Sequence, residues 1–265
     1  DVTQWLYELN WQVLPNPAAS PRDRTAAGMW WIVNAHRSLG QALAAELKRM
    51  NVESVCLDIE QAASIPPSGA VPEGIVYLSR GPSAGAAAPA FENDAAQDCI
   101  ELLSLVQAMA RAAWDNPPQL IVATCGAAAV DARTAAADLH PDQAALWGMG
   151  RVITAEHPEW RCTLIDLDPA AGMEDKVRQL AAECRPSLGR ENQLALRPDR
   201  RLGLRLVRSP MRHKPSEKTM AVPAGPYQLE IDQRGVIDNL AFQPLVLRPP
   251  GPEEVQIELD ATGLN

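Results

Sequence analysis

The sequence predicts an α/β fold in which a parallel sheet carries helices on both faces, followed by a short all-β segment. From residue 29 to residue 185, short apolar runs alternate with stretches whose apolar residues recur at helical spacing. This alternation is typical of parallel strands joined by right-handed crossover helices. After residue 225 the helical spacing gives way to an alternation with period two, which indicates half-buried strands. The first part is therefore expected to be Rossmann-like.

The elements are expected in the following places. Strands are expected at 6–13, 29–33, 52–57, 75–78, 120–124, 162–167, 193–196 and 202–207, and helices at 38–50, 94–113, 140–157 and 172–185. Helix 94–113 is expected to bury the row Ile100, Leu103, Val106 and Ala110. Residues 209–225, which include three prolines, predict a linker. Further strands are expected at 227–231, 240–247 and 255–259.

The stretch from residue 146 to residue 168 is expected to organise the first part. Leu146, Met149, Val152 and Ile153 recur at helical spacing and predict one apolar face. Pro158 is expected to end this helix, because the residue before a proline is disfavoured in the α region.

Two glycines, Gly148 and Gly150, lie inside this helix, where each costs about 1 kcal/mol relative to alanine. We expect them to allow a close approach by another backbone or a large ring. Trp147 is the nearest candidate ring.

Composition excludes several classes of function. The net charge of -9 argues against nucleic acid and anionic membranes as partners. No apolar run approaches the roughly 20 residues of a membrane span, and the first residues show no signal peptide. The five cysteines are odd in number and widely spaced, so we expect reduced thiols in a cytoplasmic protein. The four histidines show no metal-ligand spacing, so no metal site is expected.

A dinucleotide site needs glycines directly after the first strand of a Rossmann unit. Here residues 34–40 read N-A-H-R-S-L-G, and only Gly40 stands where a third glycine could be. Asp58, at the end of the next strand, imitates the acid that holds a ribose. Without the glycine turn it is expected to be a polar strand-end residue. We therefore expect this segment to bind no cofactor.

Short-chain reductases also need a tyrosine with a lysine four residues later, because the ammonium lowers the pKa of the phenol. Tyr7, Tyr77 and Tyr227 are followed at that distance by tryptophan, glycine and isoleucine. The catalytic pair of a reductase is therefore not found in the sequence.

Other candidate chemistry is weaker. Residues 81–85 match the nucleophile elbow of hydrolases with Ser83 as nucleophile, but a loop follows where a helix is required, and His157 or His213 would have to act as base. Asp166 and Asp168 are expected to flank a strand end. The basic run 185–214 lacks aromatic residues, so a solvated sheet edge that meets an acidic partner explains it better than nucleic-acid binding.

Three residues near the end of the organising helix have simple structural readings. Arg151 and Glu156 are expected to pair across the helix, and His157 is expected to interact with the last helical carbonyls.

The organising stretch carries a resemblance. The pattern W-G-x-G-R-V-x-x-x-E-H-P-x-W, followed by a strand ending D-L-D, resembles the structural subdomain of a type I polyketide synthase ketoreductase, also called the pseudo-ketoreductase. The residues that carry it are Trp147, Gly148, Gly150, Arg151, Glu156, His157, Pro158 and Asp166. The opening L-Y-x-x-x-W at residues 6–11 is similar to the start of such regions. The resemblance implies a scaffold without catalytic, cofactor-binding or metal-binding residues.

A second resemblance covers about the last 40 residues. Residues 248–265 resemble the pattern R-x-P-G-P-x-E-V-x-I-x-x-x-A-x-G-L-N that opens the GroES-like domain of a medium-chain enoyl reductase. The resemblances together imply a structural ketoreductase subdomain at 1–208, a linker at 209–225 and the first strands of an enoyl reductase at 226–265. Asn265 would then border the enoyl reductase site.

The order of these parts is that of a fully reducing synthase module. The resemblance implies a non-catalytic segment that stabilises the catalytic half of the ketoreductase and positions the enoyl reductase of the same polypeptide. NADPH is implied for the parent multienzyme, and phosphopantetheine for its acyl carrier domain, an indirect partner. Two alternatives stay open, a divergent stand-alone NADPH-dependent reductase and a hydrolase that uses Ser83.

Overall fold

The structure is a computed structural model that describes residues 6–16, 28–34, 37–64, 71–81, 88–130, 134, 139–184, 191–209, 223–231 and 240–257. The chain divides into two compact units, Asp1–Ser209 and Pro210–Asn265. The expected residues Ser83, His213 and Asn265 lie outside the described residues.

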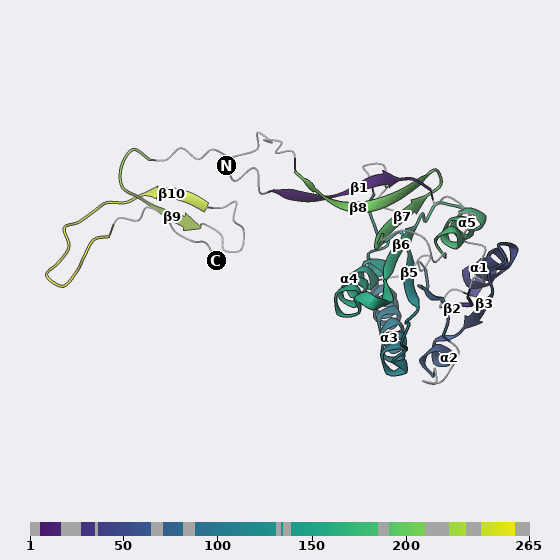
Figure 1. Cartoon of the computed structure of the whole chain (residues 1–265). Helices are drawn as coiled ribbons and strands as arrows, with labels where there is room; N and C mark the ends of the chain where they lie inside the picture. The colour runs from purple at the N-terminus through teal and green to yellow at the C-terminus, as the bar shows by residue number, and fades with distance from the viewer. Residues whose placement is uncertain are drawn as a thin grey trace. The chain divides into compact units, whose positions relative to one another are not determined.

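Within the described residues, the first unit forms an eight-stranded sheet in the order β1-β8-β7-β6-β5-β4-β2-β3 (Figure 1). The strands are β1 (Tyr7–Leu14), β2 (Trp30–Asn34), β3 (Ser54–Leu57), β4 (Gly74–Leu78), β5 (Gln119–Cys125), β6 (Thr163–Leu167), β7 (Gln193–Arg197) and β8 (Arg200–Arg208). From β3 to β7 all neighbours pair in parallel, whereas β8 pairs antiparallel with β7 and β1. The predicted parallel α/β sheet is confirmed, and β1 and β8 add an antiparallel edge.

The strand order places a reversal between β2 and β4. β3 lies on one side of β2, and β4, β5, β6 and β7 follow on the other. In a dinucleotide-binding sheet of order 3-2-1-4-5-6, strands 2 and 3 both lie on one side of strand 1. Within the described residues, only β3 lies on the corresponding side of β2. The sheet is therefore a truncated form of the doubly wound fold.

Helices cover both faces of the sheet (Figure 1). They are α1 (Arg37–Arg49), α2 (Ile59–Ala63), α3 (Ala88–Ala112), α4 (Pro141–Glu156) and α5 (Met173–Glu183). α1 packs beside α5 on one face, and α4 and α2 pack against α3 on the other. Successive side chains of a strand point to opposite faces of the sheet, so each strand contributes side chains to the contact with both helix layers.

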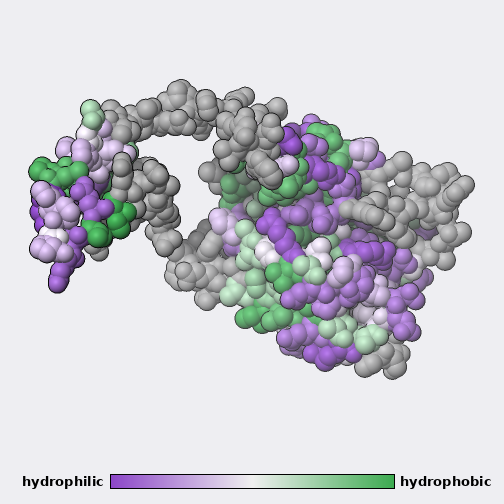
Figure 2. Space-filling view, turned by 60° about the vertical axis from the view of Figure 1, so that its left-hand side comes forward, coloured by the Kyte–Doolittle hydropathy of each residue, from purple (hydrophilic) through white to green (hydrophobic). Residues whose placement is uncertain are grey.

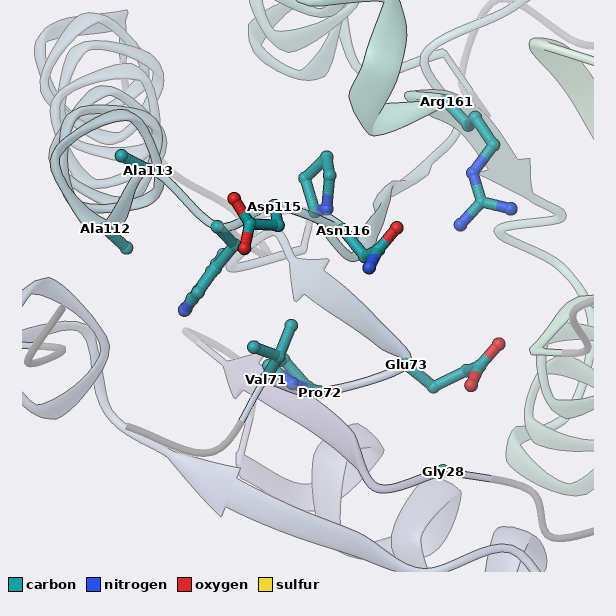
Figure 3. Close-up of a pocket in the computed structure, with 11 residues that line it drawn as sticks. Gly28, Val71, Pro72, Glu73, Ala112, Ala113, Asp115, Asn116 and Arg161 are labelled. Atoms are coloured by element: carbon teal, nitrogen blue, oxygen red, sulfur yellow. The ribbon is translucent and has the colours of Figure 1, made fainter. Parts of the chain in front are cut away.

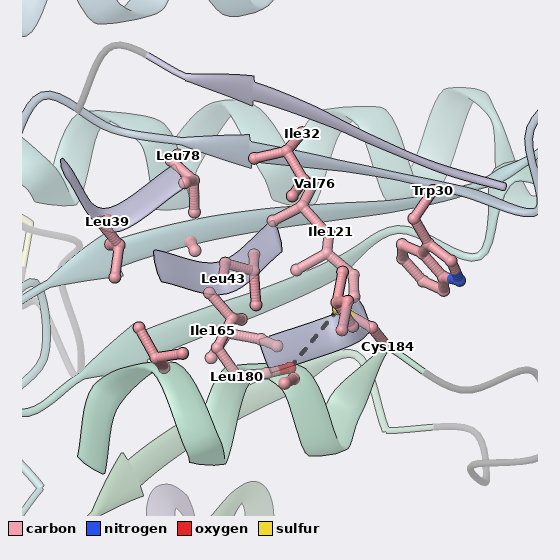
Figure 4. Close-up of a cluster of buried hydrophobic side chains, with 14 of the residues drawn as sticks. Trp30, Ile32, Leu39, Leu43, Val76, Leu78, Ile121, Ile165, Leu180 and Cys184 are labelled. Carbon is pink, nitrogen blue, oxygen red and sulfur yellow. Dashed lines mark hydrogen bonds between the residues drawn. The ribbon is translucent and has the colours of Figure 1, made fainter. Parts of the chain in front are cut away.

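The core on the α1 and α5 side is continuous across the sheet. Leu43 and Leu180 from the helices meet Ile32, Val76 and Ile121 from the strands (Figure 4). The residues next to them in each strand, such as Val33 and Val122, face α3 and α4 instead. Because both faces are buried, the strands read as unbroken apolar runs, which is why they were predictable.

The predicted inner face of α3 is wrong. Ile100 is 56% exposed and Leu103 is 45% exposed, whereas Leu102, Leu105 and Met109 are buried. α3 carries two apolar rows, and spacing alone does not say which row faces the sheet. Contacts between acidic residues of α3 and the end of β4 select the inner row.

Some element boundaries also differ from expectation. α2 is a short helix that the apolar spacing did not predict; Asp58 caps it by accepting a hydrogen bond from the Gln61 backbone, and the Gln61 side chain bonds back to Asp58. α3 begins at Ala88, six residues before the predicted start.

The second unit is described as a single β-hairpin. β9 (Tyr227–Ile231) and β10 (Leu240–Pro244) pair antiparallel, with Tyr227 and Phe242 in an edge-to-face contact at 4.9 Å. The predicted strand at 255–259 has no regular structure over 255–257, and its last two residues lie outside the described part. A bidentate pair between Arg248 and Glu254 closes the proline-rich turn.

The two glycines of α4 have different surroundings. A Cβ on Gly150 would overlap the side chain of buried Leu164 on β6, so this glycine lets α4 approach the sheet. A Cβ on Gly148 would meet nothing within 4 Å. The expected close approach therefore holds for Gly150, where the neighbour is Leu164 and not Trp147. The expectation is wrong for Gly148.

This difference predicts opposite effects of the same substitution. Gly148→Ala should raise the free energy of unfolding by about 0.5–1 kcal/mol, because alanine is favoured in helices. Gly150→Ala should lower it by about 1–3 kcal/mol, because the added methyl group overpacks the core. Urea unfolding followed by tryptophan fluorescence measures both, since all seven tryptophans belong to the first unit. Equal effects of the two substitutions would contradict the assignment.

Candidate functional site

A buried polar network joins α4 to the carboxyl ends of β5, β6 and β7. Trp147 donates from Nε1 to the Thr124 hydroxyl at 2.9 Å, and that hydroxyl donates to Asp166 Oδ1 at 2.9 Å. Arg197 donates from Nη2 to Asp166 Oδ2 at 2.9 Å. All four residues are buried, and Asp166 is completely inaccessible.

The remaining capacity of Asp166 and Arg197 is used on the loop after β5. The backbone amides of Ala127 and Ala128 donate to the two oxygens of Asp166 at 2.7 and 3.3 Å. Arg197 also donates to the carbonyls of Ala128 and Asp166. A buried charge is tolerated when its partner and its hydrogen bonds are all present, and here they are. Asp166 and Asp168 flank Leu167, the last residue of β6, as expected, and Asp166 is in addition the centre of the network.

The indole of Trp147 is enclosed from two further sides. Trp11 of β1 meets it edge-to-face at 5.9 Å between ring centroids, and the guanidinium of Arg151 lies 5.9 Å from the ring centre. Arg151 donates from Nε to Gln193 on β7 at 3.1 Å, so it does not form the expected pair with the exposed Glu156. α4 is therefore anchored to β1, β5 and β7 around one ring.

Residues 157–160 form the end of α4 and the turn that follows it. The His157 backbone amide donates to the Ile153 carbonyl at 2.8 Å and ends the helix, and Pro158 opens a short 3-10 turn to Trp160. The His157 ring does not reach the last carbonyls as expected. It stacks on Trp160 at 3.8 Å and lies 3.1 Å from Glu159.

The crevice where doubly wound sheets hold a dinucleotide would lie at the carboxyl ends of β2 and β4. Gly40 is not in the turn after β2 but inside α1, where it is buried. Asp58 serves α2 as its cap. At the end of β4, Ser79 donates to Gln143 of α4. The described groups at this crevice are therefore engaged with neighbouring helices. Residues 35–36 and 82–87 lie outside the described part.

Tyr77 is used inside the fold. Its hydroxyl is buried and donates to the Asp98 carbonyl at 3.0 Å, and burial raises the pKa of Tyr77 far above its ordinary value. Trp147 and Arg151 have the spacing of the reductase tyrosine and lysine, but an indole N–H has no accessible acid–base chemistry comparable to a phenol.

A cluster of charged groups ties the end of β4 to α3. Asp98 accepts a hydrogen bond from the Arg80 backbone at 3.2 Å, its Oδ1 lies 3.4 Å from Arg80 Nε, and Arg80 also pairs with Glu101. Burial raises the pKa of Asp98 to about 6, and the positive charge of Arg80 only partly opposes this. Because Asp98 and Glu101 must face β4, the row containing Ile100 and Leu103 faces outward.

A cavity lies at the opposite end of the strands from this polar network. It has a volume of about 630 Å³, and Figure 3 shows Glu73, Asn116 and Arg161 among the residues around it. Glu73 precedes β4 and Arg161 precedes β6, so the cavity sits at the amino ends of the strands. Ligands of doubly wound sheets bind outside the carboxyl ends, so this cavity is not a dinucleotide site of that kind.

The outer surfaces of α3 and α4 carry a set of exposed uncharged residues, called here the α3–α4 face, beside the exposed charges of Arg111, Arg151 and Glu156. Its residues are exposed and recur at helical spacing on each helix. They are Ala96, Ile100, Leu103, Gln107 and Ala110 on α3, and Ala144, Gly148, Val152 and Ala155 on α4. Figure 2, which brings this side of the first unit forward, shows green hydrophobic surface on it. Large exposed apolar patches mark interaction sites more often than chance surface.

A second exposed apolar surface lies on the pair of strands called here the β1–β8 ribbon. Only residues up to Gly203 of β8 pair with β7, so the pairs from Leu204 onward project beyond the parallel sheet. Leu9 and its cross-strand partner Leu206 are 63% and 66% exposed, on the same face as Trp11. Such a two-stranded ribbon is only marginally stable without a covering layer.

Two further findings concern the described residues. They contain no helix long and apolar enough to cross a membrane, and no cluster of three or more histidine, cysteine or acidic side chains placed to hold a metal ion. The five cysteines are free thiols.

Comparison with known proteins gives the family. Residues 9–206 match the model described as "Polyketide synthase extender module SpnB, Rossmann fold domain". Because this match covers more than half of the chain, the chain belongs to that family of polyketide synthase Rossmann domains.

Relatives and solved structures agree with the family. The chain is 32% identical over 126 residues to the mycocerosic acid synthase-like polyketide synthase of Mycobacterium tuberculosis, covering 47% of this chain and 6% of that protein. It is 43% identical over 107 residues to the polyketide synthase GfsA of Streptomyces halstedii, covering 40% of this chain and 1% of that protein. A C2-type ketoreductase from a modular polyketide synthase superimposes with a TM-score of 0.60 at 26% identity, over 77% of this chain and 44% of that one. The chain therefore spans a small part of its curated relatives and less than half of the solved ketoreductase.

The polar network predicts a large effect of one small substitution. Thr124→Val keeps the volume but removes the acceptor for Trp147 and the donor to Asp166. It should lower the free energy of unfolding by about 2–4 kcal/mol, because two buried polar groups lose a partner. The matched control is Thr154→Val on α4, whose hydroxyl bonds back to the Gly150 carbonyl of its own helix and interacts with the Cys162 thiol, but with no charged group. Similar losses of unfolding free energy for both variants in urea unfolding would contradict the role of Thr124 as the link between Trp147 and Asp166.

The raised pKa of Asp98 predicts that stability falls as pH rises. The folded state holds the Asp98 proton with a pKa of about 6, against an ordinary value of 3.8, so the contribution of this proton to stability is lost as pH rises through about 6. Between about pH 5 and about pH 7.5 this group should lower the free energy of unfolding by about 1 kcal/mol. Asp98→Asn should remove that part of the pH dependence, whereas Asp115→Asn, at an exposed loop position, should keep it. An unchanged pH profile for Asp98→Asn would refute the assignment.

Proposed function

We propose that the first unit is the non-catalytic structural subdomain of a type I polyketide synthase ketoreductase. In this proposal it stabilises the catalytic half of the ketoreductase, which binds NADPH and performs the reduction. The parent would be a multienzyme of polyketide or fatty acid chain biosynthesis. The family match and the ketoreductase-like fold support the class, and the features below support the non-catalytic role.

The absence of reductase chemistry in the sequence is the first support. The turn after β2 lacks the glycine pattern, and no tyrosine is followed by a lysine four residues later. In the described part, Asp58 caps α2 and Tyr77 is buried against Asp98. The residues that would serve a cofactor or a substrate in a reductase thus have structural roles here.

The α3–α4 face is the observation that carries the docking proposal. It presents nine exposed uncharged residues in a chain in which 22% of residues are charged. Gly148 belongs to this face, and a Cβ added there would meet no atom within 4 Å, so a partner helix can approach the backbone closely. A pair of apolar helices from the catalytic half would bury this face. The apolar row of Ile100 and Leu103 would then be covered, as its sequence spacing suggests it should be.

The β1–β8 ribbon supports a place inside a longer polypeptide. Ser209 donates from its backbone amide to the Leu6 carbonyl at 3.0 Å, so the chain enters and leaves the first unit at the same point. Leu9 and Leu206 would be covered by neighbouring parts of the same multienzyme.

We also propose that residues 209–225 link this subdomain to an enoyl reductase whose first strands lie at 226–265. Val246, Val255 and Ile257 are 93%, 82% and 72% exposed, and further strands of such a domain would cover them. Asn265 would border the site of that reductase, and phosphopantetheine on the carrier domain would bring substrate to it. The motif from Trp147 to Asp166 would have a structural role, since Trp147 and Asp166 belong to the buried network.

The proposal is tested by reconstitution. Ketone reduction with NADPH is measured for this chain, for the separately expressed catalytic half, and for their mixture. Activity that appears or rises strongly only in the mixture supports the scaffold role. Reduction by this chain alone, or saturable NADPH binding to it at micromolar affinity, would instead favour the stand-alone reductase. A serine-directed phosphonate that labels wild type but not Ser83→Ala would favour the hydrolase.

A matched pair of variants tests the docking face. Leu103→Glu places a charge on the α3–α4 face, and Met173→Glu places one at a residue of similar exposure, 43% against 45%, on α5 across the sheet. Leu103→Glu should raise the concentration of this chain needed for half-maximal activity by at least about tenfold, because a charge buried without a partner costs several kcal/mol. Met173→Glu should leave it unchanged, and both variants should unfold at wild-type urea concentrations. Equal titration curves for the two variants would mean that the catalytic half does not dock on the α3–α4 face.

A further inference from the structure

β1 is an edge strand, and its outer side has no partner among the described residues. It stands at one end of the sheet order and pairs only with β8. The Ser209 backbone amide donates to the Leu6 carbonyl, so the even-numbered residues of β1 direct their backbone groups toward β8. The odd-numbered residues direct theirs to the free edge. These residues are Tyr7, Leu9, Trp11 and Val13, and the described part of the chain offers their amides and carbonyls no hydrogen bond.

β1 lacks the features with which proteins usually protect an edge strand. Its sequence contains no proline, lysine or arginine, and its register with β8 runs without a bulge from Tyr7 to Leu14. Leu9 and Val13 are strongly exposed. The opposite edge strand, β3, has only four residues, half the length of β1. A long, regular and apolar edge strand is a site where another strand can add to a sheet.

The sequence of β1 is complementary to itself when two copies run antiparallel. With a two-fold axis at Asn10, each outward backbone group of one copy meets an outward group of the other. Tyr7 then lies opposite Val13 of the second copy, and Leu9 lies opposite Trp11 of the second copy. An aromatic residue opposite a β-branched one, as in the first pair, stabilises antiparallel strands, and the second pair is apolar as well. The apolar face of the ribbon thus continues from one copy into the other.

The other face of β1 is also compatible with this pairing. Glu8, the only charged residue of β1, lies opposite Gln12 of the second copy, whose amide can donate to the carboxylate. Asn10 meets Asn10 of the second copy on the axis, where the two amides can exchange hydrogen bonds. No like charges therefore meet across the edge. An axis one residue later would place Glu8 opposite Leu14 and leave the first outward residue without a partner.

We propose that two copies of this chain associate through the outer edges of β1 and form one continuous sheet across a two-fold axis. The pairing uses backbone groups that the fold of a single copy leaves unpaired, and it adds neighbouring strands to a ribbon that is only marginally stable alone. It closes after two copies, because neither copy then has a free β1 edge. It involves the edge of the ribbon and not its faces, so it does not depend on the proposed docking of the catalytic half.

Sedimentation velocity of the full chain, from about 1 µM to about 1 mM, measures the association. The mass should rise with concentration from 28.7 kDa toward twice that value. Leu9→Pro removes an outward N–H that the fold does not use, a change that an edge strand tolerates. It should raise the dissociation constant of the dimer by at least about tenfold, because one donor is lost in each copy. Leu9→Ala keeps the N–H and should weaken the dimer less, and both variants should unfold at similar urea concentrations.

A cysteine on the axis tests the register. Asn10→Cys places two thiols in a non-hydrogen-bonded pair, whose Cα separation of about 4.5 Å lies within the range of a disulfide. Oxidised glutathione should therefore join two copies covalently, as seen on a non-reducing gel. In Gln12→Cys the two thiols would stand four residues apart along the strands, about 13 Å, and should not be joined. The wild-type chain controls for the five native cysteines.

Several outcomes would overturn the proposal. A chain that stays monomeric up to about 1 mM would leave the edge to a strand of another protein. Assemblies larger than a dimer, a dimer that Leu9→Pro and Leu9→Ala weaken equally, or equal cross-linking of Asn10→Cys and Gln12→Cys would assign the contact to another surface or another register. Reconstitution of ketone reduction is measured separately, so its result and this one can differ.

Discussion

The ion pair between Asp166 and Arg197 is the contact on which the arrangement of the first unit depends. It joins β6 to β7, and through Thr124 and Trp147 it reaches β5 and α4. Removing either partner would leave a buried charge without its counter-ion, at a cost of about 3–5 kcal/mol. The network also orients the indole ring that meets β1, so the ribbon at the edge of the sheet is linked to its centre. At this end of the sheet the polar groups of Trp147, Thr124, Asp166 and Arg197 bind one another.

The orientation of α3 shows how polar contacts can override apolar spacing. α3 has two apolar rows, and Asp98 stands at helical spacing on the row of Leu102 and Leu105. Asp98 would have pointed to solvent only with the other row inside. The contacts of Asp98 and Glu101 with Arg80 and Tyr77 place them inside, so Leu102 and Leu105 pack on the sheet and Ile100 and Leu103 remain outside. The outer row thus stays exposed, and the bonds of Asp98 to Arg80 and Tyr77 offset part of the cost of its burial.

The sequence was informative where structure is local. Buried parallel strands appear as unbroken apolar runs, and Pro158 marked the end of α4, so the order of the elements could be predicted. The roles of Gly150 and Trp147 could not be predicted. Their neighbours in space are Leu164, Thr124 and Trp11, which belong to strands of the sheet and are distant in the sequence. α2 is too short for periodicity, although the capping residues Asp58 and Gln61 were readable. The cavity of about 260 Å³ beside α5 combines Asn16 with residues near 180 and 200, a set that no local sequence pattern connects.

The closure of the first unit at Leu6 and Ser209 has a consequence for how such proteins change over time. The two ends of this unit are joined by a hydrogen bond and therefore lie side by side. The distance between them hardly depends on the residues in between. Exchange of the whole sheet for another one that closes in the same way would therefore leave the separation of Leu6 and Ser209 unchanged. Such a unit can be replaced as one piece.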